Sequence, residues 1–212
     1  KKHQTSQQSF EVVKSQEVQL EEVDQLGILE KEIIRILLLY GNEKVDFVAS
    51  VEEIDEDGVS SYKEEVHNNQ VSKEIYLSLQ EDEIEFTNPA FKAVYYELIH
   101  QLNQQEKIMI EQLIHHENEQ IANEVTGILM DEEKHTLSDW ERKGIFVVET
   151  SKILPKLVTE AILNTRRVLI ERKIIEIMNE AKAQKSATID LELISKYTGL
   201  KQLLFEKLNR VI

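Results

Sequence analysis

The chain has 212 residues, of which 41% are hydrophobic and 31% charged, and its formal net charge is -15. This apolar content suffices to bury a core, which excludes a wholly disordered chain, and the absence of cysteine excludes disulfides, thiolate metal sites and a cysteine nucleophile. Because nucleic acids are held mainly by Lys and Arg on their phosphates, so acidic a chain is expected to bind another protein, with no direct binding of nucleic acid.

The beginning of the chain is interpreted as a lead-in to the folded part. Residues 1–24 are rich in Gln and Ser and show little hydrophobic periodicity, so they predict a linker. They contain neither a starting methionine nor the apolar core of a signal peptide, and no later run approaches the roughly 18 apolar residues of a membrane span. We therefore expect a piece of a longer cytoplasmic protein without a membrane segment.

Helices are predicted for nearly all of residues 25–153. Gly occurs 6 times and Pro twice, too seldom for a turn-rich sheet fold. The first helix spans about 25–40 and is apolar almost all round, so it is expected to be central, with Gly41 ending it in a left-handed conformation. Further helices are predicted at about 71–83, at 89–103 behind the capping pair Asn88–Pro89, at 106–116 and at 118–130.

Residues 42–70 form an acidic stretch that is harder to interpret. A short apolar segment within it, 45–54, fits a short helix, and the residues 55–61 that follow fit a loop. A calcium loop is disfavoured because Val66 stands where a bidentate Glu is required. Further along, residues 146–148 form one extended run, which cannot make a sheet alone.

The last third of the chain predicts a different arrangement. One long helix is expected from about 154 to 184, then a break and a final amphipathic helix over about 191–210. Residues 154–212 would thus form a long helix with a C-terminal helical hairpin, beside a helical bundle formed by residues 25–153. The predicted fold class is all-α, and the break would allow two copies to exchange the hairpin in a swapped dimer.

The final helix carries the candidate partner-binding residues. A broad apolar surface rimmed by cations suits docking into a groove of another protein, and Leu200, Leu204 and Leu208 form its tightest stripe. The same surface could instead pack on the long helix, so both interpretations stay open for each single residue. The candidates are Tyr197, Leu200, Lys201, Leu203, Leu204, Phe205, Lys207, Leu208, Val211 and Ile212.

The chain contains little that predicts catalysis. There is no Gly-rich phosphate loop and no Gly-x-Ser-x-Gly elbow, so no catalytic or cofactor-binding residue is predicted. The order Glu-x-x-His, which di-iron bundles use, occurs at Glu97–His100 and Glu132–His135. It supports an alternative, a metal-dependent helical-bundle enzyme. However, His100 is near a helix end and His135 falls in a predicted loop, so no metal ligand is predicted.

One cluster of cations interrupts the acidic sequence. Arg166, Arg167, Arg172 and Lys173 lie along the predicted long helix. Such a cluster is either an anion-binding patch or the solvated face of a helix, and we expect the latter.

Two segments, taken in order, resemble a known protein family. The segment ILEKEIIRILLLYGN at 28–42 is similar to the opening helix of the C-terminal domain of bacterial DNA primase. The segment LSDWERKGIFV at 137–147, followed by the long helix, resembles the same region in one lineage of these primases. Together with the terminal helical hairpin, the resemblance covers most of residues 25–212, and the acidic insertion at 42–70 departs from it.

The resemblance implies both a fold and a function. In that family this domain is a helical bundle with a C-terminal helical hairpin, which docks onto the N-terminal domain of the replicative DNA helicase and couples RNA primer synthesis to the fork. The fragment itself would not be an enzyme or need a cofactor, because the nucleotidyltransferase domains with their zinc and magnesium lie upstream. It would belong to the nucleoid-associated replisome. A nearer alternative is the similar N-terminal domain of the helicase itself.

Overall fold

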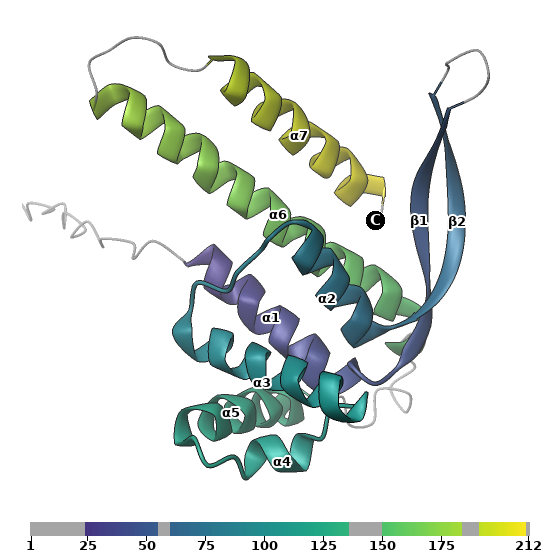
Figure 1. The fold of residues 1–212 in the computed structure, drawn as a ribbon, viewed down its shortest axis with the longest axis vertical. Coiled ribbons are helices and arrows are strands. Elements are labelled where there is room, and N and C mark those ends of the chain that lie inside the picture. The colour runs from purple at the N-terminus through teal and green to yellow at the C-terminus, as the bar shows by residue number, and fades with distance from the viewer. Residues whose placement is uncertain (1–23, 55–59, 136–149, 184–190, 211–212) are drawn as a thin grey trace, which may run out of the picture.

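The structure is a computed structural model that describes residues 24–54, 60–135, 150–183 and 191–210. Within these ranges, helices pack around a common core and a two-stranded antiparallel β-hairpin projects from it (Figure 1). In chain order the elements are α1 (Gln25–Tyr40), β1 (Lys44–Ile54), β2 (Ser60–Gln70), α2 (Val71–Glu81), α3 (Pro89–Gln105), α4 (Ile110–Ile114), α5 (Glu119–His135), α6 (Thr150–Ala183) and α7 (Leu191–Arg210). The predicted all-α class is confirmed in its helical character, and the structure adds the small two-stranded β-hairpin.

Helix α1 is the centre of the bundle, as its apolar sequence predicted. It contacts α2, α3, α5 and α6, and its side chains from Ile33 to Leu38 are almost fully buried apart from Arg35. The predicted left-handed end at Gly41 is wrong, since the residue has φ −58° and ψ −24°. Glycine is needed there for a different reason: a Cβ would collide with the backbone carbonyl oxygen of Leu37, which cannot easily move, and would also lie 2.6 Å from Cδ1 of Ile108.

The β-hairpin corrects the helix predicted within residues 42–70. Strand β1 pairs with β2 in one continuous antiparallel register, from Lys44 opposite Gln70 to Ile54 opposite Ser60. The period of two is visible in the exposure of neighbouring side chains, because Phe47 is buried at 3% whereas Val48 is 61% exposed. The short apolar run at 45–54 fits the period of a helix as well as that of a strand. Only its pairing with β2 decides in favour of the strand.

The base of this β-hairpin is fixed to the helices on both sides. The backbone N–H of Val71 donates to the carbonyl of Glu43 at 2.9 Å, and that of Ser72 donates to the carbonyl of Gly41 at 3.1 Å. These bonds join the start of α2 to the end of α1. The β-hairpin therefore begins and ends at the same place on the bundle. The position of the β-hairpin relative to α1 and α2 is therefore set at its base.

The start of α3 is held by two side chains from different parts of the chain. As predicted, Pro89 begins the helix and the Asn88 side chain accepts from the N–H of Ala90 at 2.9 Å. In addition, the buried carboxylate of Glu30 on α1 accepts from the N–H of Thr87 at 2.5 Å, from its hydroxyl at 2.8 Å and from the N–H of Asn88 at 3.0 Å. Glu30 thus fixes α3 to the central helix.

Several predicted boundaries shift in the middle of the chain. The helix predicted at 106–116 is reduced to the single turn of α4, because α3 continues to Gln105 and Glu106 then ends it in a left-handed conformation with φ 55°. Helix α5 runs to His135, so this residue lies in a helix and not in the predicted loop. Residues 146–148 lie outside the described residues.

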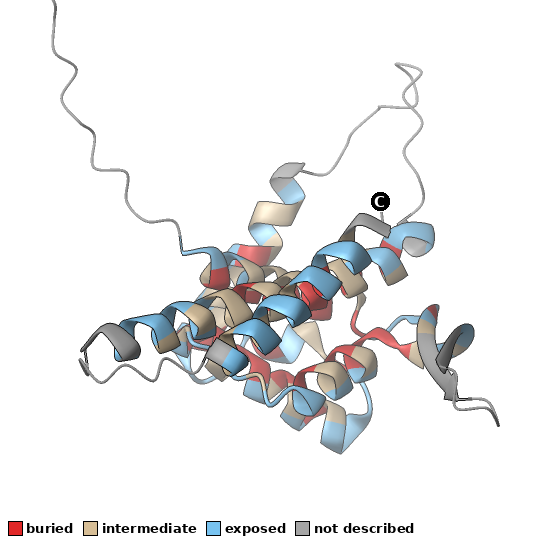
Figure 2. Ribbon diagram, turned by 90° about the horizontal axis from the view of Figure 1, so that it is seen from above, coloured by how far each residue is buried: buried red, intermediate tan, exposed pale blue. Residues whose placement is uncertain are grey.

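Helix α6 has two halves in different surroundings (Figure 2). From Leu154 to Val168 it contributes apolar side chains to the core, whereas among its described side chains beyond Val168 none is buried. Ile175 and Met178 in the second half are 57% and 43% exposed. The division expected at residue 153 therefore does not coincide with a break in packing, since the first half of α6 belongs to the bundle.

Replacing Glu30 by Ala should destabilise the protein by about 2–4 kcal/mol, because it removes a buried acceptor and leaves the N–H groups at the start of α3 without their partner. The free energy of unfolding, measured by urea denaturation, tests this. Glu81→Ala, at an exposed position of α2, is the control and should change it by no more than about 0.5 kcal/mol. Equal effects of the two substitutions would contradict the role given to Glu30.

Candidate partner-docking surface

Helix α7 lies antiparallel along α6 (Figure 1). Its direction follows from three contacts, because Lys201 meets Glu171, Phe205 meets Arg167, and Lys207 lines a groove with residues still earlier in α6. Among the described side chains of α7 only Leu204, at 5% exposure, is buried. Helix α7 therefore lies on the outside of the molecule with one buried side chain, several half-buried ones (Leu193, Ile194, Tyr197 and Leu208) and a set of polar contacts.

The polar contacts centre on the carboxylate of Glu171. It accepts from Nζ of Lys201 at 2.9 Å and from Arg167 at 3.2 Å to each oxygen, while both cations lie 5.7 Å from the ring centroid of Phe205. Desolvation acts to raise the pKa of Glu171, but the hydrogen bond from Lys201 and the charges of the two cations outweigh it, so the pKa lies below its usual value. Two cations thus share one ionised carboxylate.

The exposed apolar residues of α7 lie on two flanks and not on one stripe. Leu200, Leu203 and Phe205 are 45%, 56% and 42% exposed. At about 100° per residue, Leu203 and Phe205 point about 200° apart around the helix axis, on either side of the buried Leu204. We call the side of Leu200 and Leu203 the Leu203 flank, and the opposite side, with Lys201, the Phe205 flank. The predicted stripe is divided because its middle residue faces α6.

The ten predicted partner-binding residues fall into four groups. Leu204 is buried and Leu200, Leu203, Phe205 and Lys207 are exposed, so the first packs on α6 and only the others present full surface to a partner. The half-buried residues are Tyr197, Lys201 and Leu208, and those outside the described residues are Val211 and Ile212.

A groove borders each flank of α7. Beside the Leu203 flank, a groove of about 540 Å³ lies between β1, α2 and α6, and Lys207 lines its end. Beside the Phe205 flank, a smaller pocket of about 270 Å³ is lined by Gln25, Ile28, Leu29, Arg167 and Val168. Ile28 is 58% exposed, although α1 was expected to be central because its sequence is apolar almost all round. Its exposure depends on where α6 crosses α1, which the periodicity of α1 alone does not reveal.

The cation cluster of α6 is used for ion pairs within the chain. Arg166 pairs with Asp82 and Arg172 with Asp24 at 3.0 Å, which joins α6 to the end of α2 and to the start of α1. The remaining pairs, within α6 itself, are Arg167–Glu171 at 3.2 Å and Lys173–Glu176 at 2.7 Å. The cluster is therefore neither a bare anion patch nor only a solvated face, because two of its members connect helices.

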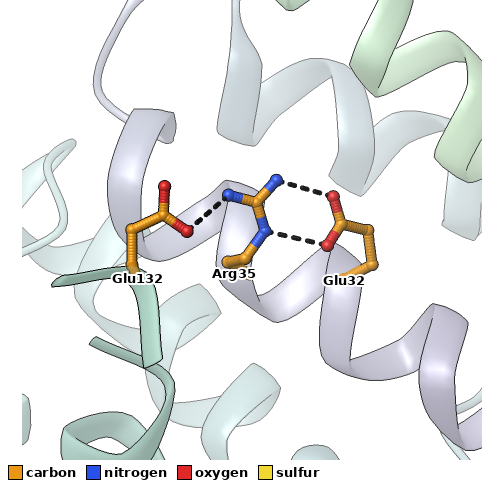
Figure 3. Close-up of polar contacts among 3 residues, drawn as sticks. All are labelled: Glu32, Arg35 and Glu132. Atoms are coloured by element: carbon orange, nitrogen blue, oxygen red, sulfur yellow. Dashed lines mark hydrogen bonds and ion pairs between the residues drawn. The ribbon is translucent and has the colours of Figure 1, made fainter. Parts of the chain in front are cut away.

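The glutamates of the two Glu-x-x-His pairs have different partners. Glu132 accepts from Arg35, which also forms two hydrogen bonds with Glu32 (Figure 3). The hydrogen bond with Glu32 is the largest cause of the raised pKa of Arg35, and it outweighs desolvation. Glu97 lies 3.7 Å from His116. Among the residues that the structure describes, no three His, Cys, Asp or Glu side chains form a group that could hold a metal ion.

The fold and this surface define a mostly helical protein with an externally attached final helix. The chain matches the model of a family described as a domain of unknown function, DUF8430, over residues 13–211, and it belongs to that family. Neither the curated proteins nor the solved structures contain a match to it. Within the described ranges, every helix is too short or too polar to cross a membrane.

Acidification should loosen α7 from α6. Because the pKa of Glu171 is lowered in the fold, its stabilising contribution is complete above the unfolded pKa of about 4.3 and is lost as the pH falls through the lower folded value. Hydrogen exchange of residues 192–208, corrected for the intrinsic pH dependence, should therefore rise below about pH 4. Glu171→Gln should exchange faster already at pH 7, whereas Glu176→Gln, whose ion pair lies within α6, should resemble the parent protein. Identical exchange in both variants would contradict this assignment.

Proposed function

We propose that this chain is the helicase-binding domain of a bacterial DNA primase, which docks onto the N-terminal domain of the replicative helicase. The observation that carries the proposal is the state of α7, which lies on the outside of the bundle and displays Leu200, Leu203 and Phe205. An apolar helix surface of this kind is the form in which helices dock into grooves of other proteins. The resemblance of residues 28–42 and 137–147 to primase supplies the identity of the partner.

In this proposal the two halves of α6 have different roles. The first half, through Val168, anchors the helix in the bundle, and the second half carries α7 away from it. A partner that covers the Leu203 flank buries Leu200 and Leu203, while the cation of Lys207 lies at the rim and attracts a carboxylate. The chain binds without turnover and thereby keeps primer synthesis, performed by other domains of the primase, at the cytoplasmic replication fork.

Charge further supports a protein partner over a nucleic acid. The formal net charge is -15, and all four members of the cation cluster on α6 are paired with carboxylates of this chain. A phosphate backbone, which is negative along its whole length, would have to approach a strongly negative molecule. A protein surface that contributes apolar side chains and a few charges meets no such cost.

Leu203→Asp should weaken binding to the replicative helicase by roughly tenfold or more, because it puts a charge in the centre of the proposed apolar contact. Isothermal titration calorimetry with the purified helicase measures the dissociation constant. The matched control is Leu77→Asp on α2, since Leu77 is 51% exposed and Leu203 is 56% exposed. Unchanged affinity of the Leu203 variant would reject the proposed function.

A chain that ends at residue 183 should fold but fail to bind. It retains every described core residue except Leu204, so its midpoint of thermal unfolding should fall by only a few degrees. Circular dichroism measures that midpoint, and calorimetry with the helicase measures the loss of binding. If the shortened chain bound the helicase as tightly as the full chain, α7 would not be the docking element.

A further inference from the structure

The pocket between α1 and α6 contains an apolar side chain that the fold leaves open. Ile28 is 58% exposed on a helix whose next apolar turns, through Ile33 and Ile34, are buried to 1% or less. It lines the pocket of about 270 Å³ together with Leu29 and Val168. We call this the α1–α6 pocket. Its volume has room for a large aliphatic or aromatic side chain, and its apolar wall favours one.

Arg167 lies between the α1–α6 pocket and the Phe205 flank of α7. It lines the pocket, and its guanidinium carbon lies 5.7 Å from the ring centroid of Phe205. A single partner element could therefore touch Phe205 on α7 and Ile28 on α1 while it crosses α6. Arg167 on α6 thus has an exposed apolar side chain on each side, Ile28 on α1 and Phe205 on α7.

The charge at this junction differs from that of the molecule as a whole. Arg167 and Lys201 are two cations around the single carboxylate of Glu171, so the group carries one excess positive charge, and the neighbouring pair Arg172–Asp24 is neutral. In a chain of formal net charge -15, such a locally positive surface selects for an acidic group on the partner.

We propose that the α1–α6 pocket is a second contact for the partner of α7. One helix of the helicase N-terminal domain inserts a large apolar side chain between Ile28 and Val168, and an acidic residue of the same helix pairs with Arg167 and Lys201. This inference rests on the proposed function and extends it, because it assigns the bundle a direct part in recognition. The helicase then touches both the bundle and α7, so its affinity depends on the angle between them.

The apolar part of the contact is tested with Ile28→Gln, which removes the exposed side chain without adding a charge. We expect the dissociation constant for the purified replicative helicase to rise roughly tenfold, while the midpoint of thermal unfolding stays unchanged. If Leu203→Asp weakens binding and Ile28→Gln leaves it within twofold of the parent chain, the second contact is refuted and the proposed function remains. If both leave binding unchanged, the proposed function fails as well.

The charge of the partner is tested at Gln25, which is exposed and lines the same pocket. With an acidic residue on the partner helix, Gln25→Lys should tighten binding about threefold and Gln25→Glu should weaken it by a similar factor, and both effects should shrink at high salt. This pair keeps the test decisive even if Ile28→Gln lowers stability. The opposite order, or no difference between the two variants, would refute the acidic partner.

A second copy of this chain is the competing occupant. Sedimentation velocity of the parent chain and Ile28→Gln distinguishes the two cases. If Ile28→Gln abolishes self-association of the parent and leaves helicase affinity unchanged, the pocket belongs to a contact between copies and the proposal is overturned. A parent chain that remains a monomer, together with the loss of helicase binding in the variant, supports it.

Discussion

The structure depends on the continuity of α6, a single helix of 34 residues. One half of it packs in the core and the other half lies at the surface. Its first half buries Leu154 and Val158 completely in the core, so its axis is fixed by the bundle. Because a helix transmits its direction through its backbone hydrogen bonds, the second half must continue along that axis into solvent. The part of α6 on which α7 packs is thereby placed by residues of α6 that are buried in the bundle.

The point where α6 leaves the core is reinforced by ion pairs from two sides. Arg166 reaches Asp82 at the end of α2, and Arg172 reaches Asp24 at the start of α1. Partly exposed pairs of this kind contribute only about 0–1 kcal/mol each to stability. Their effect is geometric, because they resist bending of α6 between the bundle and α7.

Sequence reasoning succeeded where the determining interaction is local. The centrality of α1 followed from its apolar residues, and the start of α3 followed from Asn88 and Pro89, whose roles depend on neighbours two or three residues away. Sequence reasoning failed where the position of an element or side chain depends on residues far away in the sequence. The β-hairpin requires β2 to pair with β1, the buried position of Leu204 requires α6, and the exposure of Ile28 depends on how helices cross. The candidate surface on the final helix stays a prediction, and the structure identifies Leu204 as the one of its described residues that is buried.

The weak attachment of α7 gives a physical reason why a partner would change this helix. Leu204 is its one fully buried described side chain, and the partly exposed Lys201–Glu171 pair contributes at most about 1 kcal/mol. Ordering α7 costs about 1–2 kcal/mol per residue, which opposes this stabilisation. A partner that covers either flank adds apolar burial to the side of the ordered helix. Docking would then fix α7 on α6 in addition to binding it, so affinity should respond to any change that alters their pairing.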